Sequence, residues 1–380
     1  MRSGGEGLMS SNYFCIILNL PTDLIYKIFC RLQVKFISRC RVVCKAWYNL
    51  LSIPGFVNYY AKNTPFTTLV LSHYQQAAAI TERDIFSFLE ISEDGDDCTR
   101  TTINAKLPFW PQRNSALSLE DSCNGLLCFL LYNHKVDCHV IYIYNPTSGK
   151  SISLPEHRFR QHPIIFKHPY EEYSLAYLFG FSPSTNNFKV LKSVHIFDKR
   201  NKKDRVVRSE IFTVGVDHEW RQLKYAFYVR CPVCSLDLNV AACWFIGNTS
   251  IVAFDFGEEK LGHIPPPRGV VVNYRNMMLV ALNRRLCLFD YSVPSHYTIW
   301  TMEEYGVVES WTKTVISRSC FSSDAPVLHH PIAMLRNGNI LFKLVGTKVL
   351  VIYSPKRKEC TVVEVLNDVE GLIGCIMEFE

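Results

Sequence analysis

The 380-residue sequence contains no run that approaches the roughly 18 apolar residues of a membrane-spanning helix. The apolar stretch FCIILNL, residues 14–20, is too short for such a span and leads directly into residues typical of a helix. For the same reason a cleaved signal peptide is a poor interpretation of that stretch. We therefore expect no membrane partner. Residues 1–13, which begin with many glycines and serines, are predicted to be a disordered leader.

The sequence also lacks the cysteine pattern of a secreted, disulfide-stabilised protein. It has 15 cysteines, an odd number, and many lie within apolar runs such as residues 126–129 and 286–289. Disulfide frameworks have an even count at loop-like spacings, whereas cysteines scattered in apolar runs behave as small buried hydrophobes. This usage predicts reduced thiols in a protein of the cytoplasm, the nucleus or both.

Signatures of catalysis are missing as well. There is no GxSxG elbow, no glycine-rich loop that could cradle a phosphate and no HExxH metal motif. Several histidines occur in segments that we interpret as loops, without carboxylates at a fixed spacing from them: His157, His162, His168, His329 and His330. We therefore predict no catalytic residues, no cofactor and no enzymatic activity of the chain's own.

Two local clusters could hold a metal or a nucleic acid, but a structural role fits each better. CPVC, residues 231–234, is followed by Cys243 nine residues on, and no second Cys/His pair completes a four-ligand zinc site. We predict ordinary thiols there and no metal. The segment DKRNKKDRVVR, residues 198–208, carries six basic residues. It is interpreted as a solvated hairpin loop, with a nuclear-import or nucleic-acid patch as the alternative.

Acidic residues are nearly absent from one region, residues 21–62. That region has seven Lys and Arg residues against Asp23 alone, a net charge of +6, which equals the net charge of the whole chain. The rest of the chain is therefore close to neutral. A basic end of this kind predicts an acidic partner, which could be a protein, a nucleic acid or a membrane surface.

The same basic region contains two helical patterns. The first is one apolar stripe at helical spacing: Leu24, Ile25, Ile28, Phe29 and Leu32. The second repeats this spacing: Phe36, Ile37, Cys40, Val43, Cys44 and Trp47. Pro54-Gly55 is interpreted as the end of the helical region. Because about forty residues cannot bury so many large apolar side chains among themselves, either the rest of the chain or another protein must cover them.

Beyond about residue 64 the sequence changes to short β-like runs separated by turn residues, and no segment predicts a long amphipathic helix. Several runs share one design, an apolar strand ending in an aromatic residue, a polar turn and a second strand: residues 141–155, 180–192, 210–223, 251–267, 286–302 and 349–365. Degenerate repetition at about 30–45 residues in an all-β region predicts a propeller. We expect six blades, with seven next. A pair of packed β-sandwiches is the alternative.

The stretch LPTDLIYKIFCRLQVKFISRCRVVCKAW, residues 20–47, resembles the F-box motif. The matching elements, in chain order, are Leu20-Pro21, Asp23, Leu24, Ile28, Leu32 and Val43-Cys44-Lys45-x-Trp47. One departure is Gln33, where many plant members have a proline that would stiffen the turn between the helices. The alternative interpretation is a helical hairpin packed on the chain's own core.

Downstream segments resemble the plant F-box-associated (kelch-like) domain: residues 121–129, 144–150, 179–192 and 309–313. The resemblance implies an α+β multidomain protein, with a small N-terminal helical F-box at residues 14–62 and an all-β propeller-like domain at residues 63–380. It implies a non-catalytic substrate receptor of an SCF-type ubiquitin ligase. The F-box would bind the small acidic adaptor, which in turn binds a cullin. The β-domain would bind the target protein for ubiquitination.

The resemblance and the apolar stripe together predict the adaptor-binding residues: Leu20, Pro21, Leu24, Ile25, Ile28, Phe29, Leu32, Val43, Cys44 and Trp47. Target-binding residues are not predicted, because the loops of a propeller vary without disturbing its sheets. The alternative function is a nucleic-acid-binding protein that places the basic helices on phosphates. Phosphate binding would weaken steeply with salt, whereas docking on an apolar stripe would not.

Overall fold

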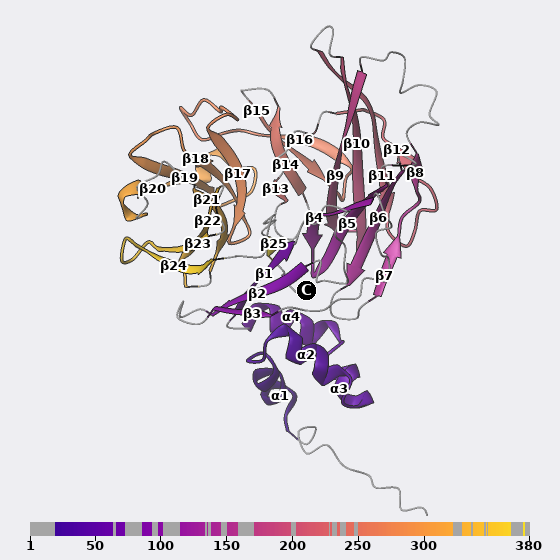
Figure 1. Ribbon diagram of the computed structural model, residues 1–380, viewed down its shortest axis with the longest axis vertical. Coiled ribbons are helices and arrows are strands. Elements are labelled where there is room, and N and C mark those ends of the chain that lie inside the picture. The colour runs from indigo at the N-terminus through magenta and orange to yellow at the C-terminus, as the bar shows by residue number, and fades with distance from the viewer. Residues whose placement is uncertain are drawn as a thin grey trace, which may run out of the picture. The chain divides into compact units, whose positions relative to one another are not determined.

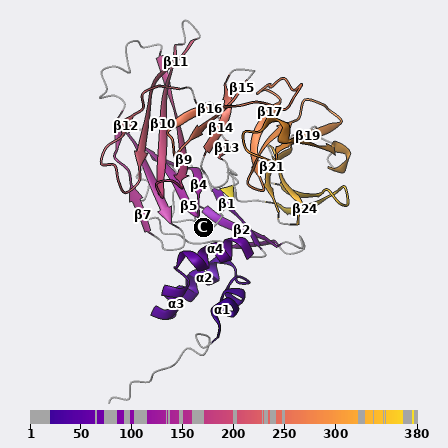
Figure 2. The same cartoon turned by 180° about the vertical axis from the view of Figure 1, so that it is seen from behind.

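The structure, a computed structural model, describes residues 20–63, 66–72, 86–92, 98–101, 115–133, 135, 138–145, 150–158, 171–198, 203–227, 229, 234–235, 241–246, 250–321, 329–335, 337–345, 347, 349–365 and 375–376. The predicted leader, residues 1–13, lies outside them. The chain divides into two compact units, Met1–Pro65 with Phe379–Glu380, and Phe66–Glu378. We call them the helical unit and the β-unit. Figures 1 and 2 show their elements from opposite sides.

The described part of the helical unit has four helices, where two helical patterns were expected. They are α1 (Thr22–Phe29), α2 (Val34–Arg41), α3 (Lys45–Leu50) and α4 (Pro54–Asn63). The second predicted pattern is interrupted between α2 and α3, because Val42 ends α2 and Cys44, in an extended conformation, precedes α3. Two consecutive β-branched residues, Val42 and Val43, disfavour a continuous helix at this point.

Pro54-Gly55 begins a helix, so the prediction that it ends the helical region is wrong. Pro54 is the first residue of α4. Proline suits this position because the N–H that it lacks would have no partner within the helix. The correction matters for the core, since α4 supplies Phe56 and Tyr60, which are 1% and 4% exposed.

The core of the helical unit is apolar and rich in aromatic side chains. The Phe56 ring lies edge-on to those of Tyr26 and Phe29, with centroids 5.3 and 6.2 Å apart. The Tyr60 hydroxyl donates a hydrogen bond of 2.7 Å to the backbone carbonyl of Leu32. Within residues 20–63, no polar or charged side chain is buried among those that the structure describes.

The β-unit is an all-β propeller of antiparallel sheets, as predicted, and not a pair of sandwiches. Five sheets are formed by consecutive strands, sheet by sheet: β4 (Ser115–Cys123), β5 (Leu126–Asn133), β6 (Cys138–Asn145), β7 (Lys150–Ser153) and β8 (His157–Arg158); β9 (Glu171–Ser182), β10 (Asn187–Asp198), β11 (Lys203–Thr213) and β12 (Arg221–Gln222); β13 (Cys234–Ser235), β14 (Ala241–Ile246), β15 (Ser250–Asp255) and β16 (Lys260–Ile264); β17 (Met277–Leu282), β18 (Arg285–Asp290), β19 (His296–Met302) and β20 (Trp311–Ser317); β21 (His329–Met334), β22 (Ile340–Leu344), β23 (Val349–Ser354) and β24 (Glu359–Val365).

A further sheet joins distant parts of the β-unit. In it β25 (Cys375–Ile376) pairs with β1 (Phe66–Ser72), which is followed by β2 (Phe86–Ser92) and β3 (Cys98–Thr101). One edge strand of each sheet contacts an edge strand of the next sheet, in the order β25, β4, β9, β13, β17 and β21. The structure thus shows five blades of consecutive strands. The expected number of six is not confirmed, since it requires counting the composite sheet as a blade.

The predicted strand–turn–strand units are confirmed as antiparallel pairs: β6–β7, β9–β10, β11–β12, β15–β16, β18–β19 and β23–β24. The basic segment at residues 198–208 lies on the β10–β11 hairpin, with Asp198 opposite Lys203. The tip of that hairpin, residues 199–202, lies outside the described residues. The hairpin part of the interpretation is therefore confirmed, and its exposure to solvent stays a prediction.

The prediction of loops at His329 and His330 is wrong, because both residues begin strand β21. Pro331 follows them, and a proline within an apolar run argues against a strand. The structure accommodates this proline by an irregularity in the β21–β22 pairing between Pro331 and Ala333. The loop prediction is also wrong at His157, which lies in β8, whereas His162 and His168 fall outside the described residues.

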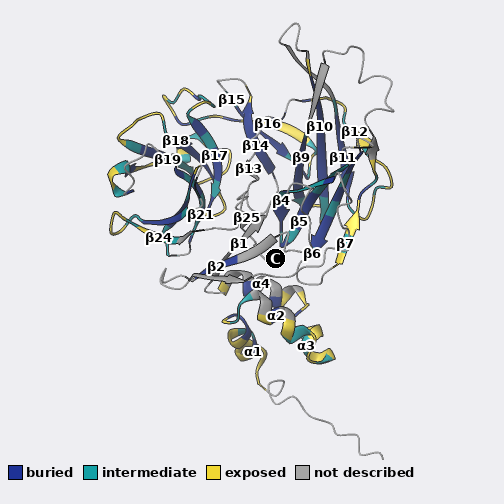
Figure 3. Ribbon diagram, in the orientation of Figure 1, coloured by how far each residue is buried: buried dark blue, intermediate teal, exposed yellow. Residues whose placement is uncertain are grey.

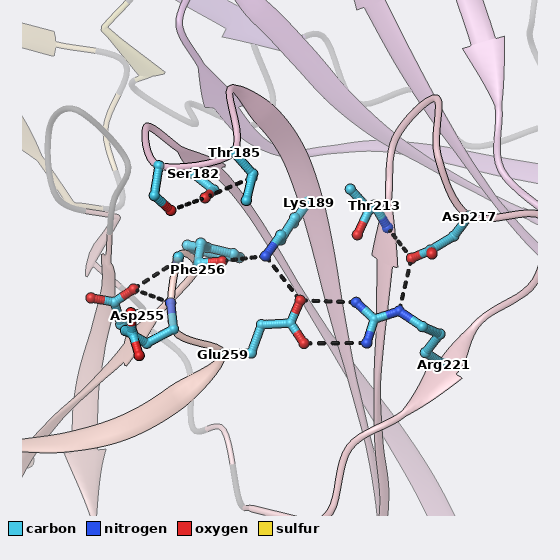
Figure 4. A network of polar contacts seen from close by, with 12 residues as sticks. Ser182, Thr185, Lys189, Thr213, Asp217, Arg221, Asp255, Phe256 and Glu259 are labelled. Carbon is cyan, nitrogen blue, oxygen red and sulfur yellow. Dashed lines mark hydrogen bonds and ion pairs between the residues drawn. The ribbon is translucent and has the colours of Figure 1, made fainter.

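A polar network joins β10 to the turn between β15 and β16, in the neighbouring blade (Figure 4). The ammonium group of Lys189, a residue 4% exposed, donates to the backbone carbonyl of Phe256 at 2.7 Å and contacts Glu259 at 2.9 Å. Arg221 contacts Glu259 at 2.8 Å and Asp217 at 3.1 Å. Because a buried ammonium needs satisfied donors, these contacts stabilise Lys189 and link the two blades.

Close packing accompanies this network. The Phe256 ring lies against Gly180 of β9, where an added Cβ would be 2.2 Å from the ring carbons. Only glycine therefore allows this approach. The Phe256 side chain itself is fully buried.

A second buried ion pair lies within the blade of β9–β12. The Lys192 ammonium group is 2.5 Å from a carboxylate oxygen of Glu210, and their side chains are 0% and 4% exposed. Burial lowers the pKa of Lys192 to about 8, and the Glu210 carboxylate opposes that shift. The Lys192 ammonium group also lies 4.2 Å from the centre of the Trp220 ring. The β-unit thus keeps ionisable side chains inside, each with a partner.

Candidate functional site

Helix α1 carries two apolar faces. Ile25 and Phe29, which are 3% and 2% exposed, belong to the core of the helical unit. Leu24 and Ile28 are also four residues apart, and they are 46% and 44% exposed. Residues four apart lie on one side of a helix with 3.6 residues per turn, so the two pairs occupy neighbouring faces. Figure 3 shows exposed residues of α1 in yellow.

The start of α1 is set by Pro21. Its carbonyl accepts backbone hydrogen bonds from Leu24 at 3.0 Å and Ile25 at 3.1 Å, and no side chain caps the helix. Pro21 is exposed, and Leu20 before it is 39% exposed. Two predicted residues therefore extend the exposed apolar surface to the N-terminal end of α1.

The segment between α2 and α3 adds two exposed valines. Val42 is 83% exposed and Val43 is 63% exposed. Cys44, which follows them, is partly buried and takes an extended conformation as the N-cap of α3. Of these three residues, Val43 and Cys44 were predicted from the motif, and Val42 was not.

Trp47 is a predicted partner-contact residue that also packs against the core of the helical unit. It is partly buried, and its ring packs edge-on against Phe29 with centroids 5.0 Å apart. This contact makes Trp47 part of the wall of the core of the helical unit. Loss of Trp47 would therefore disturb the packing of the unit as well as any partner contact.

The structure divides the ten predicted residues into three groups. The exposed group can meet a partner directly, and we call it the exposed apolar set: Leu20, Pro21, Leu24, Ile28 and Val43. Two residues are buried in the unit's own core and can act only by positioning the others: Ile25 and Phe29. Three are partly buried: Leu32, Cys44 and Trp47.

Sequence reasoning omitted several exposed apolar residues from the predicted site: Phe36, Val42, Tyr48 and Ile53. The guanidinium group of Arg39 lies over the Phe36 ring at 5.8 Å. A signal was available for Val42, because a β-branched pair between two helical runs marks a break. Tyr48 and Ile53 lie off the motif's stripe, so its spacing gives no indication of them.

The basic residues of the helical unit separate into exposed and structural ones. The Arg41 side chain donates two hydrogen bonds, of 3.1 and 2.6 Å, to the carbonyl of Leu51. Burial lowers the pKa of Arg41, which a nearby Tyr48 partly opposes. Arg41 therefore ties α2 to the end of α3. Other basic residues are exposed and give the surface its positive charge: Lys27, Arg31, Arg39 and Lys45.

The candidate zinc cluster gains no support. Among the described residues, no three His, Cys, Asp or Glu side chains gather as a metal site. Burial raises the pKa of Cys243 to about 12, so its thiol keeps its proton. Residues 231–233, which include the first cysteine of CPVC, lie outside the described residues. In the part of the chain that the structure describes, no helix is long and apolar enough to cross a bilayer.

Two family models match the chain. Residues 17–59 match the F-box domain, and residues 76–370 match the F-box associated beta propeller domain. The second match covers most of the chain, in the β-unit. Neither match addresses the kelch-like character, which stays a prediction.

Two curated relatives carry the F-box in their names. "F-box protein At3g07870" of Arabidopsis thaliana is 27% identical, with 89% of this chain and 85% of the relative covered. "F-box protein DOR" of the same plant is 26% identical, with 68% of this chain and 65% of the relative covered. Among solved structures, the chain is similar to a prolyl endopeptidase, with a TM-score of 0.41 and 12% identity. The match covers 91% of this chain and 50% of that chain.

Proposed function

We propose a function from the family to which the chain belongs, that of plant F-box proteins with an F-box associated beta propeller domain. In this proposal the chain is the substrate-recognition subunit of an SCF-type ubiquitin ligase. The helical unit binds the acidic adaptor, and through it the cullin. The β-unit binds a target protein. The chain works in the cytoplasm, the nucleus or both.

One observation carries the adaptor part of the proposal. Leu24 and Ile28 remain nearly half exposed although the same helix supplies two residues to a complete core. Burying a large apolar side chain contributes about 1.5–3 kcal/mol, so a partner that covers this face gains considerably before association costs are subtracted. A soluble helical unit has no reason of its own to present such a pair on one face.

Charge supports an acidic partner. Lys27, Arg31 and Lys45 are exposed, and Asp23 is the only acidic residue between residues 21 and 62. Charges at the rim of an interface accelerate encounter with a partner of opposite sign more than they strengthen the final complex. The exposed apolar set would then provide most of the affinity.

The chain itself needs no catalytic residues in this proposal. The ubiquitin-transfer chemistry belongs to other subunits, and the receptor raises the local concentration of a target lysine beside them. A propeller fits this role because loops at its ends can vary without disturbing the sheets. Six blades, with the composite sheet of β25 and β1–β3 as one of them, and a kelch-like character belong to the same proposal.

The test is adaptor binding by the full chain, measured by isothermal titration calorimetry with a purified adaptor. We expect Leu24→Ala and Ile28→Ala each to weaken binding by about tenfold or more, because each removes one buried anchor of about 1.5–3 kcal/mol. Val362→Ala is the matched control, since Val362 is 59% exposed but lies on β24. It should leave the affinity unchanged.

Salt separates this proposal from nucleic-acid binding. Adaptor binding through the exposed apolar set should change little between low and high salt, whereas binding to phosphates would weaken steeply. If Leu24→Ala and Ile28→Ala both bind the adaptor as the wild type does, the proposed site is wrong. If the chain binds nucleic acid with a steep salt dependence and no adaptor, the alternative function replaces the proposed one.

A further inference from the structure

A side-chain contact between Arg41 and Leu51 encloses the segment between them, residues 42–50. Arg41 donates to the backbone carbonyl of Leu51 from Nε at 3.1 Å and from Nη2 at 2.6 Å. Arg41 is the last residue of α2, and Leu51, which is fully buried, directly follows α3. Hydrogen bonds from a charged donor are stronger than those between neutral groups. The guanidinium group therefore holds the two ends of the 42–50 segment together.

The 42–50 segment has little other support on its solvent side. Val42 and Val43 are 83% and 63% exposed, so core packing does not hold them. The N–H group of each donates one hydrogen bond of 3.2 Å to the last turn of α2. Helix α3 has six residues, and Cys44, its N-cap, forms no side-chain cap. Because a helix of this length is unstable in isolation, the segment depends on its tertiary contacts.

The same segment carries three of the predicted adaptor-binding residues: Val43, Cys44 and Trp47. The Trp47 ring packs on Phe29 of α1, with centroids 5.0 Å apart, and this contact fixes one point of α3. The bonds from Arg41 fix a second point, at the C-terminal end of α3. A short helix that is held at one point can turn about it, whereas two points set its direction. Arg41 thus limits the directions that Val43 can take.

We propose that Arg41 is a positioning residue for adaptor binding, which holds Val42 and Val43 in the arrangement that the adaptor contacts. Val42, which the motif does not include, contributes to that contact beside Val43. A segment that is already ordered loses less entropy when it binds. Lysine is a poor substitute for Arg41, because only the planar guanidinium directs two N–H groups at one oxygen. This inference rests on the proposed function.

The test is a double-mutant cycle in the full chain, with adaptor affinity measured by calorimetric titration. Arg41→Ala should weaken binding by about tenfold and Val43→Ala by about fivefold. Because Val43 contributes only where Arg41 holds it, the variant with both changes should bind within about twofold of Arg41→Ala alone. Leu24→Ala is the matched control for coupling. Leu24 lies on α1, so its effect and that of Arg41→Ala should multiply.

Arg39→Ala separates positioning from charge. Arg39 is exposed, lies on the same helix and carries the same charge. Its loss should weaken binding only slightly and only at low salt, because salt screens an exposed charge. The effect of Arg41→Ala should persist at high salt. Arg41→Lys, which keeps the charge, should still weaken binding by about threefold, and this milder variant serves if thermal melting shows that Arg41→Ala is unfolded.

Hydrogen exchange of the free chain, measured by mass spectrometry, needs no adaptor. Amides of residues 42–51 should exchange faster in both Arg41 variants, and those of α1 should exchange as in the wild type. Independent effects in the Val43 cycle, wild-type affinity of Arg41→Lys, or unchanged exchange would each reject the positioning role while the proposed function stands. A wild type that binds no adaptor rejects the proposed function. Faster exchange would in that case still show that Arg41 holds the 42–50 segment.

Discussion

The helical unit and the β-unit distribute apolar and charged side chains in opposite ways. The described part of the helical unit buries no polar or charged side chain, yet it leaves Leu24 and Ile28 nearly half exposed. The β-unit buries Lys192, Glu210 and His329, each at most 4% exposed. The β-unit thus buries charged side chains with their partners, whereas the helical unit leaves part of its apolar surface exposed, and the proposed function assigns that surface to the adaptor.

Exposure alone does not make this distinction. Outer strands of the β-unit also show exposed apolar residues, one on each of four strands: Ile152 on β7, Leu261 on β16, Val315 on β20 and Val362 on β24. Single exposed apolar residues are normal on a protein surface. Leu24 and Ile28 differ because they share one face of one helix, beside further exposed apolar residues at Leu20 and Pro21.

The largest expected effect is on the β-unit alone. Phe256→Ala should lower its free energy of unfolding by about 3–5 kcal/mol, because Phe256 is fully buried between blades. Adaptor affinity should stay the same, since the proposed site lies in the other unit. Calorimetric unfolding and adaptor titration of one preparation measure both. A loss of adaptor affinity in Phe256→Ala would contradict the separation of the two units.

An intermediate effect is expected where partner contact and packing coincide. Trp47→Ala should destabilise the helical unit by about 1–3 kcal/mol, because it removes a half-buried ring from Phe29, and it should also weaken adaptor binding. The β-unit should unfold as in the wild type. Tyr48→Ala is the control, since Tyr48 is 53% exposed and next in sequence. Unchanged stability of the helical unit in Trp47→Ala would show that the ring serves the partner only.

The effect that is smallest at neutral pH appears only in acid. Burial, and to a lesser degree Arg318, lowers the pKa of His329 to about 4 from the usual value near 6.5. The His329 ring accepts or donates a hydrogen bond of 2.7 Å with the Tyr297 hydroxyl. Because the unfolded chain binds the proton more readily, the stability that His329 contributes is lost as pH falls from about 6.5 to about 4.

Calorimetry across this pH range tests the effect. The β-unit transition should move to lower temperature in acid more than the helical-unit transition does, because residues 20–63 hold no buried acid or histidine among those described. His329→Gln, which keeps a hydrogen-bonding group near Tyr297, should flatten the dependence. Identical pH dependence of the wild type and this variant would show that other groups dominate.

The strand pairs were predictable because their signals are local. An apolar run, a turn with Pro or Gly and a second apolar run lie within about fifteen residues, so the pairing at β6–β7 or β23–β24 needs no distant information. The same holds for the apolar period of α1. The spacing could not show which residues of α1 face inward. Ile25 and Phe29 face the core because they pack in one cluster with Phe56 of α4.

The errors have a common origin in tertiary context. Pro54 can end one helix or begin another, and only the packing of Phe56 and Tyr60 decides between them. His330 and Pro331 enter β21 because a neighbouring strand accommodates an irregular pairing.

The pairing of β25 with β1 also limits when this sheet can be completed during translation of the chain. Val70 pairs with Cys375, and Leu69 pairs with Ile376, so β1 can complete this sheet only after the strands of all five other sheets have been synthesised. While the ribosome is still translating the intervening sheets, one edge of β1 stays open to chaperones or to other nascent chains. A chain truncated shortly before residue 375 would keep the pairing of β1 with β2 and leave open the edge of β1 that β25 occupies.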